Sequence, residues 1–184
     1  MNAMADTQVA LDPSGEIRVS LSPDDFAVAE RVGAQRTEEA RQARRPGRAG
    51  CPPDNLEQDI DGAAAEIAFA RVLGVPPVLS VSPDSGPDVA GFHVRSTSLS
   101  NGHLIIRPGE AKDNRYVLLV GQGTDWRVIG TIAGRDAVRP EFWRPPDART
   151  GCYMVPQWQL VRLQQQPSKI AVPRGDLAAR NERI

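Results

Sequence analysis

The segment that most constrains the fold is the apolar run YVLLV at residues 116–120. Five consecutive apolar residues bounded by polar residues and glycine favour a short strand that is buried on both faces. A second apolar segment, residues 126–132, follows after the turn-forming residues 121–125. This spacing predicts a β-hairpin with its first strand at the centre of a sheet.

Two helices are predicted ahead of the hairpin. The first begins after Ser22, an N-cap residue followed by proline, and extends to about residue 45, where a Pro-Gly pair ends it. The second spans roughly residues 54–73, with Asp54 as its N-cap, Glu57 at the capping-box spacing and Gly74 as its C-terminal stop.

Short alternating or apolar segments predict further strands, at residues 16–21, 78–81, 92–97, 104–106 and 152–155. We expect the strand at 104–106 to return from that at 92–97 through the Asn-Gly turn at 101–102. The order predicts an α/β or α+β fold, a central mixed sheet flanked by helices. The chain divides into an N-terminal arm or strand (1–21), one domain (22–163) and a flexible C-terminal tail (164–184).

The composition limits the classes of partner and compartment. Lys and Arg number 22 against 23 Asp and Glu, so nucleic-acid binding would need a local basic patch. No apolar run is long enough to cross a membrane, and the N-terminus lacks the features of a signal peptide. Cys51 and Cys152 lie far apart, which favours two free thiols in a reducing, cytoplasmic compartment over a disulfide.

The candidate site lies in the sequence PDVAGFHVRST at residues 87–97. Asp88 ends a turn, and the next strand carries the triplet His93-Val94-Arg95, a polar, an apolar and a basic residue. About twenty residues upstream, Glu66 is the one acid in an alanine-rich stretch of helix. An acid on a helix, an aspartate before a strand and a polar-x-basic triplet can hold a divalent metal against a phosphate.

This order resembles the PD-(D/E)XK nuclease superfamily over roughly residues 54–132, and the resemblance implies a restriction-endonuclease-like core. It further implies that Glu66, Asp88 and the Val94 carbonyl bind Mg²⁺ or Mn²⁺. His93 stands where the family has a carboxylate, and Arg95 where it has lysine. We expect Glu66, Asp88 and Arg95 to converge in one cleft with His93 at its edge, and Glu110 is a further candidate acid. The whole chain also resembles small phage and actinobacterial proteins.

Both departures from the family pattern weaken catalysis. A histidine ligand suits Mn²⁺ better than Mg²⁺, and arginine binds phosphate but does not act as a base near neutral pH. One hypothesis is therefore a weak metal-dependent nuclease that acts on nucleic-acid phosphodiesters and favours Mn²⁺. The alternative is a catalytically inactive module that binds nucleic acid or protein, such as a phage-type accessory or assembly protein.

Each candidate residue also has a structural interpretation. Glu66 could point to solvent, His93 could be a partly buried core residue, and Arg95 could form an internal ion pair with Asp88 or Glu66. The basic run of Arg41, Arg44, Arg45 and Arg48 could either contact DNA phosphates or complement the helix C-terminus. DNA is the expected nucleic acid, and the tail at 164–184 could serve a homo-oligomer or a protein partner.

Overall fold

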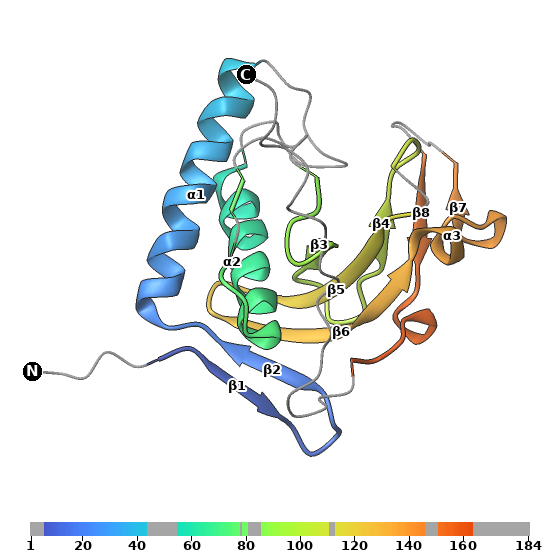
Figure 1. Ribbon diagram of the computed structural model, residues 1–184. Helices are drawn as coiled ribbons and strands as arrows, with labels where there is room; N and C mark the ends of the chain where they lie inside the picture. Colours follow the sequence, from blue (N-terminus) through green and yellow to red (C-terminus); the bar gives the residue numbers. More distant parts are fainter. Residues whose placement is uncertain are drawn as a thin grey trace, which may run out of the picture.

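In the computed structural model, residues 6–43, 55–77, 79–80, 86–110, 113–145 and 151–163 are described. The fold is α+β, with a five-stranded mixed sheet, a second sheet of three strands, and helices (Figure 1). The elements are β1 (Gln8–Leu11), β2 (Ile17–Ser20), α1 (Pro23–Gln42), α2 (Leu56–Leu73), β3 (Phe92–Thr97), β4 (Leu104–Ile106), β5 (Arg115–Gln122), β6 (Asp125–Ala133), α3 (Gly134–Ala137), η1 (Pro140–Phe142), β7 (Trp143–Arg144), β8 (Cys152–Val155) and η2 (Gln157–Gln159).

Strand β5 forms the centre of the molecule and is buried on both faces, as its apolar run predicts. The five-stranded sheet has the order β1-β2-β6-β5-β3, and the three-stranded sheet has the order β4-β8-β7. Val117 and Leu119 of β5 join the core under α2, whereas Tyr116 and Leu118 join a second core with β4 and β8. Helix α2, with α1 packed on it, and the small sheet therefore cover opposite faces of the large sheet.

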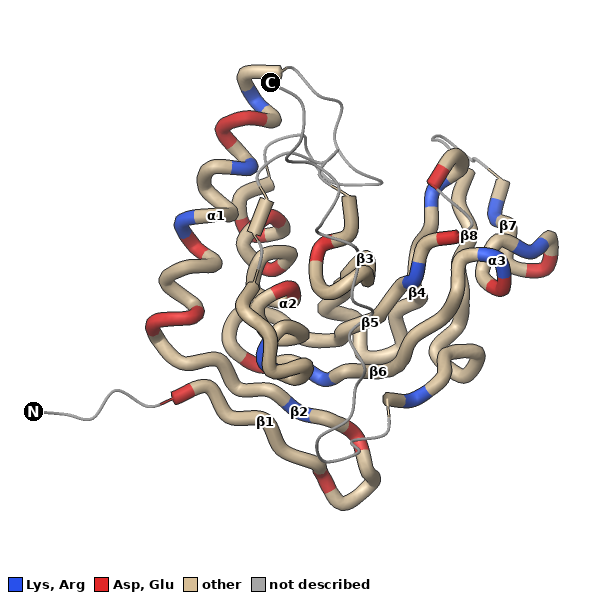
Figure 2. Tube along the Cα trace, viewed as in Figure 1, with Lys and Arg blue, Asp and Glu red and all other residues tan. Residues whose placement is uncertain are grey.

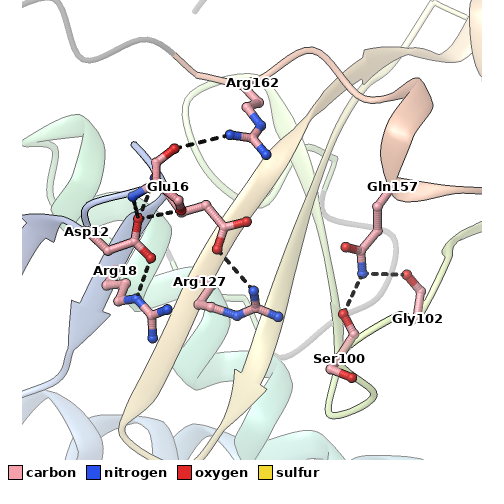
Figure 3. A network of polar contacts seen from close by, with 9 residues as sticks. Asp12, Glu16, Arg18, Ser100, Gly102, Arg127, Gln157 and Arg162 are labelled. Atoms are coloured by element: carbon pink, nitrogen blue, oxygen red, sulfur yellow. Dashed lines mark hydrogen bonds and ion pairs between the residues drawn. The ribbon is translucent and has the colours of Figure 1, made fainter.

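The hairpin of β5 and β6 is confirmed, but the predicted hairpin of residues 92–97 with 104–106 is wrong. Strand β3 pairs in parallel with β5, and β4 pairs antiparallel with β8. Burial explains the difference, because Leu104 and Ile106 are fully buried in the second core, on the far side of the large sheet from α2. The Gln157 side chain donates to the carbonyls of Ser100 and Gly102, both at 3.0 Å, which fixes the turn that carries the chain to the small sheet (Figure 3).

The capping residues set the helix boundaries. Ser22 is the N-cap of α1, as predicted, and its hydroxyl accepts a hydrogen bond from the Asp25 amide. Asn55, rather than the predicted Asp54, caps α2 through its side-chain oxygen, which accepts from the Gln58 amide at 3.2 Å. Gly74 ends α2 in the left-handed conformation that glycine adopts without strain. Of the predicted strand at 78–81, residues 79–80 are described and are not in a strand.

Helices α1 and α2 run antiparallel and are joined by polar pairs at both ends. Arg71 near the end of α2 donates two hydrogen bonds to Asp25 at the start of α1. Thr37 near the end of α1 donates to Asp59 near the start of α2 at 2.8 Å. Between these pairs Gly33 lies directly against Ile60, so the helix backbones approach closely there.

The N-terminal segment contributes β1 and β2 to the edge of the large sheet. The Asp12 carboxylate closes their turn by accepting hydrogen bonds from Ser14, from the Glu16 amide and from Arg18 (Figure 3). These hydrogen bonds, of which the one from the Ser14 side chain has the largest effect, hold the pKa of Asp12 far below its ordinary value. Glu16 in turn pairs with Arg127 of β6 at 3.0 Å, which ties the turn to the central hairpin. Among the described helices, none is long and apolar enough to cross a bilayer.

Candidate functional site

Glu66 lies in the middle of α2, on the side that faces α1. The alanines around it, Ala63, Ala64, Ala65 and Ala68, are fully buried and let α2 pack closely between α1 and the sheet. Glu66 itself is 8% exposed. It therefore does not point to solvent, and its charge has to be balanced inside the protein.

The balancing cation is Arg36 of α1. Its two terminal nitrogens donate to the two Glu66 carboxylate oxygens at 2.9 and 2.8 Å, which is the bidentate geometry of a strong ion pair. Nε and Nη2 also donate to the Ser80 carbonyl at 2.9 and 2.7 Å. Gly62, one helical turn before Glu66, lies beside this guanidinium, and an added Cβ would lie 3.8 Å from Nη1, an ordinary van der Waals contact.

The environment of Arg36 stabilises its charged form. Burial alone would lower the pKa of the guanidinium. The hydrogen bonds and charge of Glu66 outweigh that effect, with smaller contributions from the charges of Asp88 and Asp59, and the pKa of Arg36 is raised. A fixed cation therefore already serves the helix acid and acts electrostatically on the strand aspartate.

Asp88 lies at the start of a tight turn that leads into β3. Ala90 and Gly91 have positive φ values of 46° and 84°, as a two-residue hairpin turn of type I′ requires. The amides of Asp88 and Val89 donate to the Phe92 carbonyl. The Asp88 Oδ2 atom accepts a hydrogen bond from the Val94 amide at 2.8 Å, so this carboxylate caps the outer edge of β3.

The side chains of β3 alternate between the two faces of the large sheet. Phe92 and Val94 are buried in the core beneath α2. Arg95 lies on the opposite face, where Nη2 donates to both carboxylate oxygens of Glu110 at 2.9 Å and the guanidinium lies 5.5 Å from the ring centre of Tyr116. The His93 ring lies on that same face, 5.5 Å from the Tyr116 ring centre.

The structure therefore does not bring Glu66 and Arg95 together in one cleft. The large sheet lies between them, and each has its own partner of opposite charge. Arg95 does form an internal ion pair, but with Glu110 rather than with Asp88 or Glu66. Glu110 thus neutralises a cation of the predicted site instead of adding a metal ligand.

The three predicted metal ligands are each engaged in hydrogen bonds. Both Glu66 oxygens accept from Arg36, Asp88 Oδ2 accepts from the Val94 amide, and the Val94 carbonyl accepts from Arg95 Nη1 at 3.2 Å. Mg²⁺ and Mn²⁺ need several converging oxygen atoms. The residues present do not fit such an ion, and the described part of the chain contains no group of three or more His, Cys, Asp or Glu side chains that could hold one.

The predicted basic patch falls largely outside the described residues, which include Arg41 but not Arg44, Arg45 or Arg48. Arg41 is exposed and forms an ion pair with Glu38 one turn earlier, at 3.0 Å. The basic residues of the described chain are all arginines, and they are spread over helices and strands with acids between them (Figure 2).

A groove of about 590 Å³ lies beside the helix pair, between α2 and the turn that joins β5 to β6. Its walls come from the start of α1, the first turns of α2 and that turn: Phe26, Leu56, Glu57, Ile60, Asp61, Gln122, Gly123 and Thr124. Asp61 Oδ1 accepts from the Gly123 amide at 2.9 Å, which fixes one wall. We refer to this feature as the α2 groove.

Sequence reasoning missed Arg36 and the α2 groove. Arg36 belongs to no motif, and its partner is 30 residues away in the chain, so only the packing of the two helices identifies it. The groove has one sequence signal, the acids Glu57 and Asp61 at the i,i+4 spacing beside the apolar Leu56 and Ile60 at the same spacing.

No family model matches the chain, and neither a curated protein sequence nor a solved structure matches it.

Proposed function

We propose that this chain is a non-catalytic module that binds a partner protein, in a fold that keeps the order of a PD-(D/E)XK site without its chemistry. The observation that carries the proposal is the bidentate pair of Arg36 with Glu66. In the nuclease hypothesis the helix acid donates its oxygens to a divalent metal. Here both oxygens already bind a guanidinium that is largely buried with them.

Replacing Arg36 by a metal would be costly. The displaced guanidinium would lose its bonds to Glu66 and Ser80 inside the protein, and leaving one member of a buried ion pair without its partner costs about 3–5 kcal/mol. Arg95 is likewise committed to Glu110, so binding a phosphate would require that pair to open. These commitments support the inactive alternative over the nuclease.

The charges at the surface favour a protein over a nucleic acid as the binding partner. Several described arginines are already paired with acids, among them Arg18, Arg71 and Arg127. The α2 groove carries two carboxylates, which would repel a phosphate backbone. A cytoplasmic location, predicted from the two widely spaced cysteines, is part of the same proposal, and Cys152 is a free thiol.

Two assays test this proposal on the full-length protein. The first incubates wild type, Asp88→Ala and Glu66→Gln with plasmid and single-stranded DNA in Mg²⁺ and in Mn²⁺. We expect no cleavage above that of the variants. Metal-dependent cleavage that both substitutions abolish would establish the nuclease instead.

The second assay measures the fluorescence anisotropy of labelled duplex DNA near physiological salt. We expect no binding stronger than the non-specific range, a Kd of about 10⁻⁴–10⁻⁶ M. The control is a variant with alanine at Arg41, Arg44, Arg45 and Arg48. If the wild type bound DNA more tightly than this range and the variant did not, the module would bind DNA rather than a protein.

A further inference from the structure

The α2 groove combines apolar walls with unbalanced negative charge. Phe26, Leu56 and Ile60 supply the apolar surface, and Leu56 is 46% exposed. Glu57 and Asp61 supply two carboxylates one helical turn apart. None of the eight described residues that line the groove is a cation, and within the described chain the Gly123 amide alone donates to either carboxylate.

The helix keeps the two acids one turn apart although they repel each other. Like charges at the i,i+4 spacing destabilise a helix. Burial raises the pKa of Asp61, the hydrogen bond from the Gly123 amide opposes this, and the charge of Glu57 raises the pKa by a smaller amount. Burial and the Glu57 charge both disfavour the ionised carboxylate in the isolated protein, so a cation placed in the groove would relieve them.

The opposite wall is rigid. The Gly123 amide donates to Asp61 and the Gly123 carbonyl accepts from the indole nitrogen of Trp126 at 3.0 Å. The next carbonyl, that of Thr124, accepts from the Leu21 amide at 2.9 Å. Trp126 is 2% exposed, so the turn is anchored in the main core and the groove does not need to form on binding.

Size and charge together define the occupant. The volume lies within the roughly 300–1,000 Å³ typical of ligand sites. We infer that the α2 groove binds a segment of a partner protein in which a lysine or arginine side chain, flanked by apolar side chains, pairs with Glu57 and Asp61. This inference rests on the proposed protein-binding function and names the chemistry of the partner.

The test uses three tripeptides that differ only in the charge of the central residue: N-acetyl-Leu-Lys-Leu-amide, its Gln analogue and its Glu analogue. Each is titrated into the ¹⁵N-labelled full-length protein at pH 7, with the amide signals of Gly123 and Thr124 as reporters. We expect the Lys peptide to shift both signals and to bind about tenfold more tightly than the Gln peptide, with no detectable binding of the Glu peptide.

The matched variant is Glu57→Gln/Asp61→Asn, which keeps an oxygen acceptor for the Gly123 amide and removes both charges. We expect the preference for the Lys over the Gln peptide to disappear in this variant, while the spectrum elsewhere stays that of the wild type. Gly62→Ala, which lies on the same helix outside the lining of the groove, is expected to bind as wild type.

Three results would overturn the inference: equal affinity for the Lys and Gln peptides, an unchanged preference in the double variant, or no shift of the reporter signals with any peptide. Displacement of the reporter signals by duplex DNA would also overturn it. Its failure is distinct from failure of the proposed function, because the cleavage and anisotropy assays do not involve the α2 groove.

Discussion

Among single residues, Arg36 has the largest consequence. A divalent cation between a helix acid and a strand aspartate would need carboxylate oxygens that are open to it, and Arg36 uses both oxygens of Glu66. A guanidinium carries a positive charge, as a divalent metal does, but it cannot activate water. The same sequence order is thus compatible with a structural ion pair.

Arg36→Met should destabilise the protein strongly. It leaves the Glu66 charge buried without its cation, which costs about 3–5 kcal/mol. The double variant Arg36→Met/Glu66→Met removes both charges and should recover most of that loss. Urea unfolding of the two variants and the wild type measures the difference. If the double variant were as unstable as the single one, the loss would come from packing and not from the unpaired charge.

The ion pair of Asp25 with Arg71 predicts that the stability of the protein depends on pH. The hydrogen bonds from Arg71 lower the pKa of Asp25; burial opposes this shift, and Thr7 reinforces it. Because the folded pKa lies below the unfolded value of about 3.9, the ionised carboxylate stabilises the protein above that pH. The contribution is lost as the pH falls through the folded pKa.

Asp25→Asn should therefore destabilise the protein near neutral pH and weaken its loss of stability below about pH 4. Unfolding free energies measured between pH 7 and pH 2 test this. Equal slopes for variant and wild type in the acidic range would show that Asp25 has the same pKa in the folded and unfolded chains.

At the level of elements, the close contact of α1 with α2 positions Arg36 against Glu66. A Cβ added to Gly33 would lie 2.6 Å from both the backbone nitrogen and Cγ1 of Ile60, so the helices would have to separate. Alanine favours helix over glycine by about 1 kcal/mol. At this position the clash should outweigh that gain.

We expect Gly33→Ala to lower the midpoint of thermal unfolding, and Gly62→Ala to raise it. The second glycine lies in the partner helix, and among the described residues its added Cβ would meet only the Arg36 guanidinium, at 3.8 Å. Because both variants replace glycine by alanine, comparing them separates the effect of packing on stability from the effect of helix propensity. A rise in the midpoint for both would mean that the α1–α2 contact adapts at little cost.

Across the whole molecule, local signals in the sequence predicted elements better than their pairing. The Ser22 cap, the Gly74 stop and the run at 116–120 each depend on neighbouring residues, and the structure confirms them. The alternation of 92–97 predicts which side chains share a face but not which strand lies beside them, so the parallel pairing of β3 with β5 was missed. The partners of Glu66 and Arg95 depend on that same long-range packing.

The two cores meet on β5, and this predicts how the molecule unfolds. Leu118 and Leu119 are adjacent in β5 and both fully buried, but Leu118 packs toward the small sheet and Leu119 toward α2. Because one strand serves both cores, loss of either should remove the support of the other. Leu118→Ala and Leu119→Ala should each cost about 2–5 kcal/mol of global stability.

Amide hydrogen exchange distinguishes shared from independent cores. In Leu118→Ala we expect the amides of Phe69 and Ala70, on the opposite side of the sheet, to lose as much protection as those of Leu104 and Ile106. If the small sheet lost protection alone while α2 kept its wild-type rates, the three-stranded sheet would be a separately unfolding unit. If both variants instead lost amide protection throughout the protein, the helical layer would depend on the small sheet through the central strand β5. That layer carries Arg36 and the α2 groove.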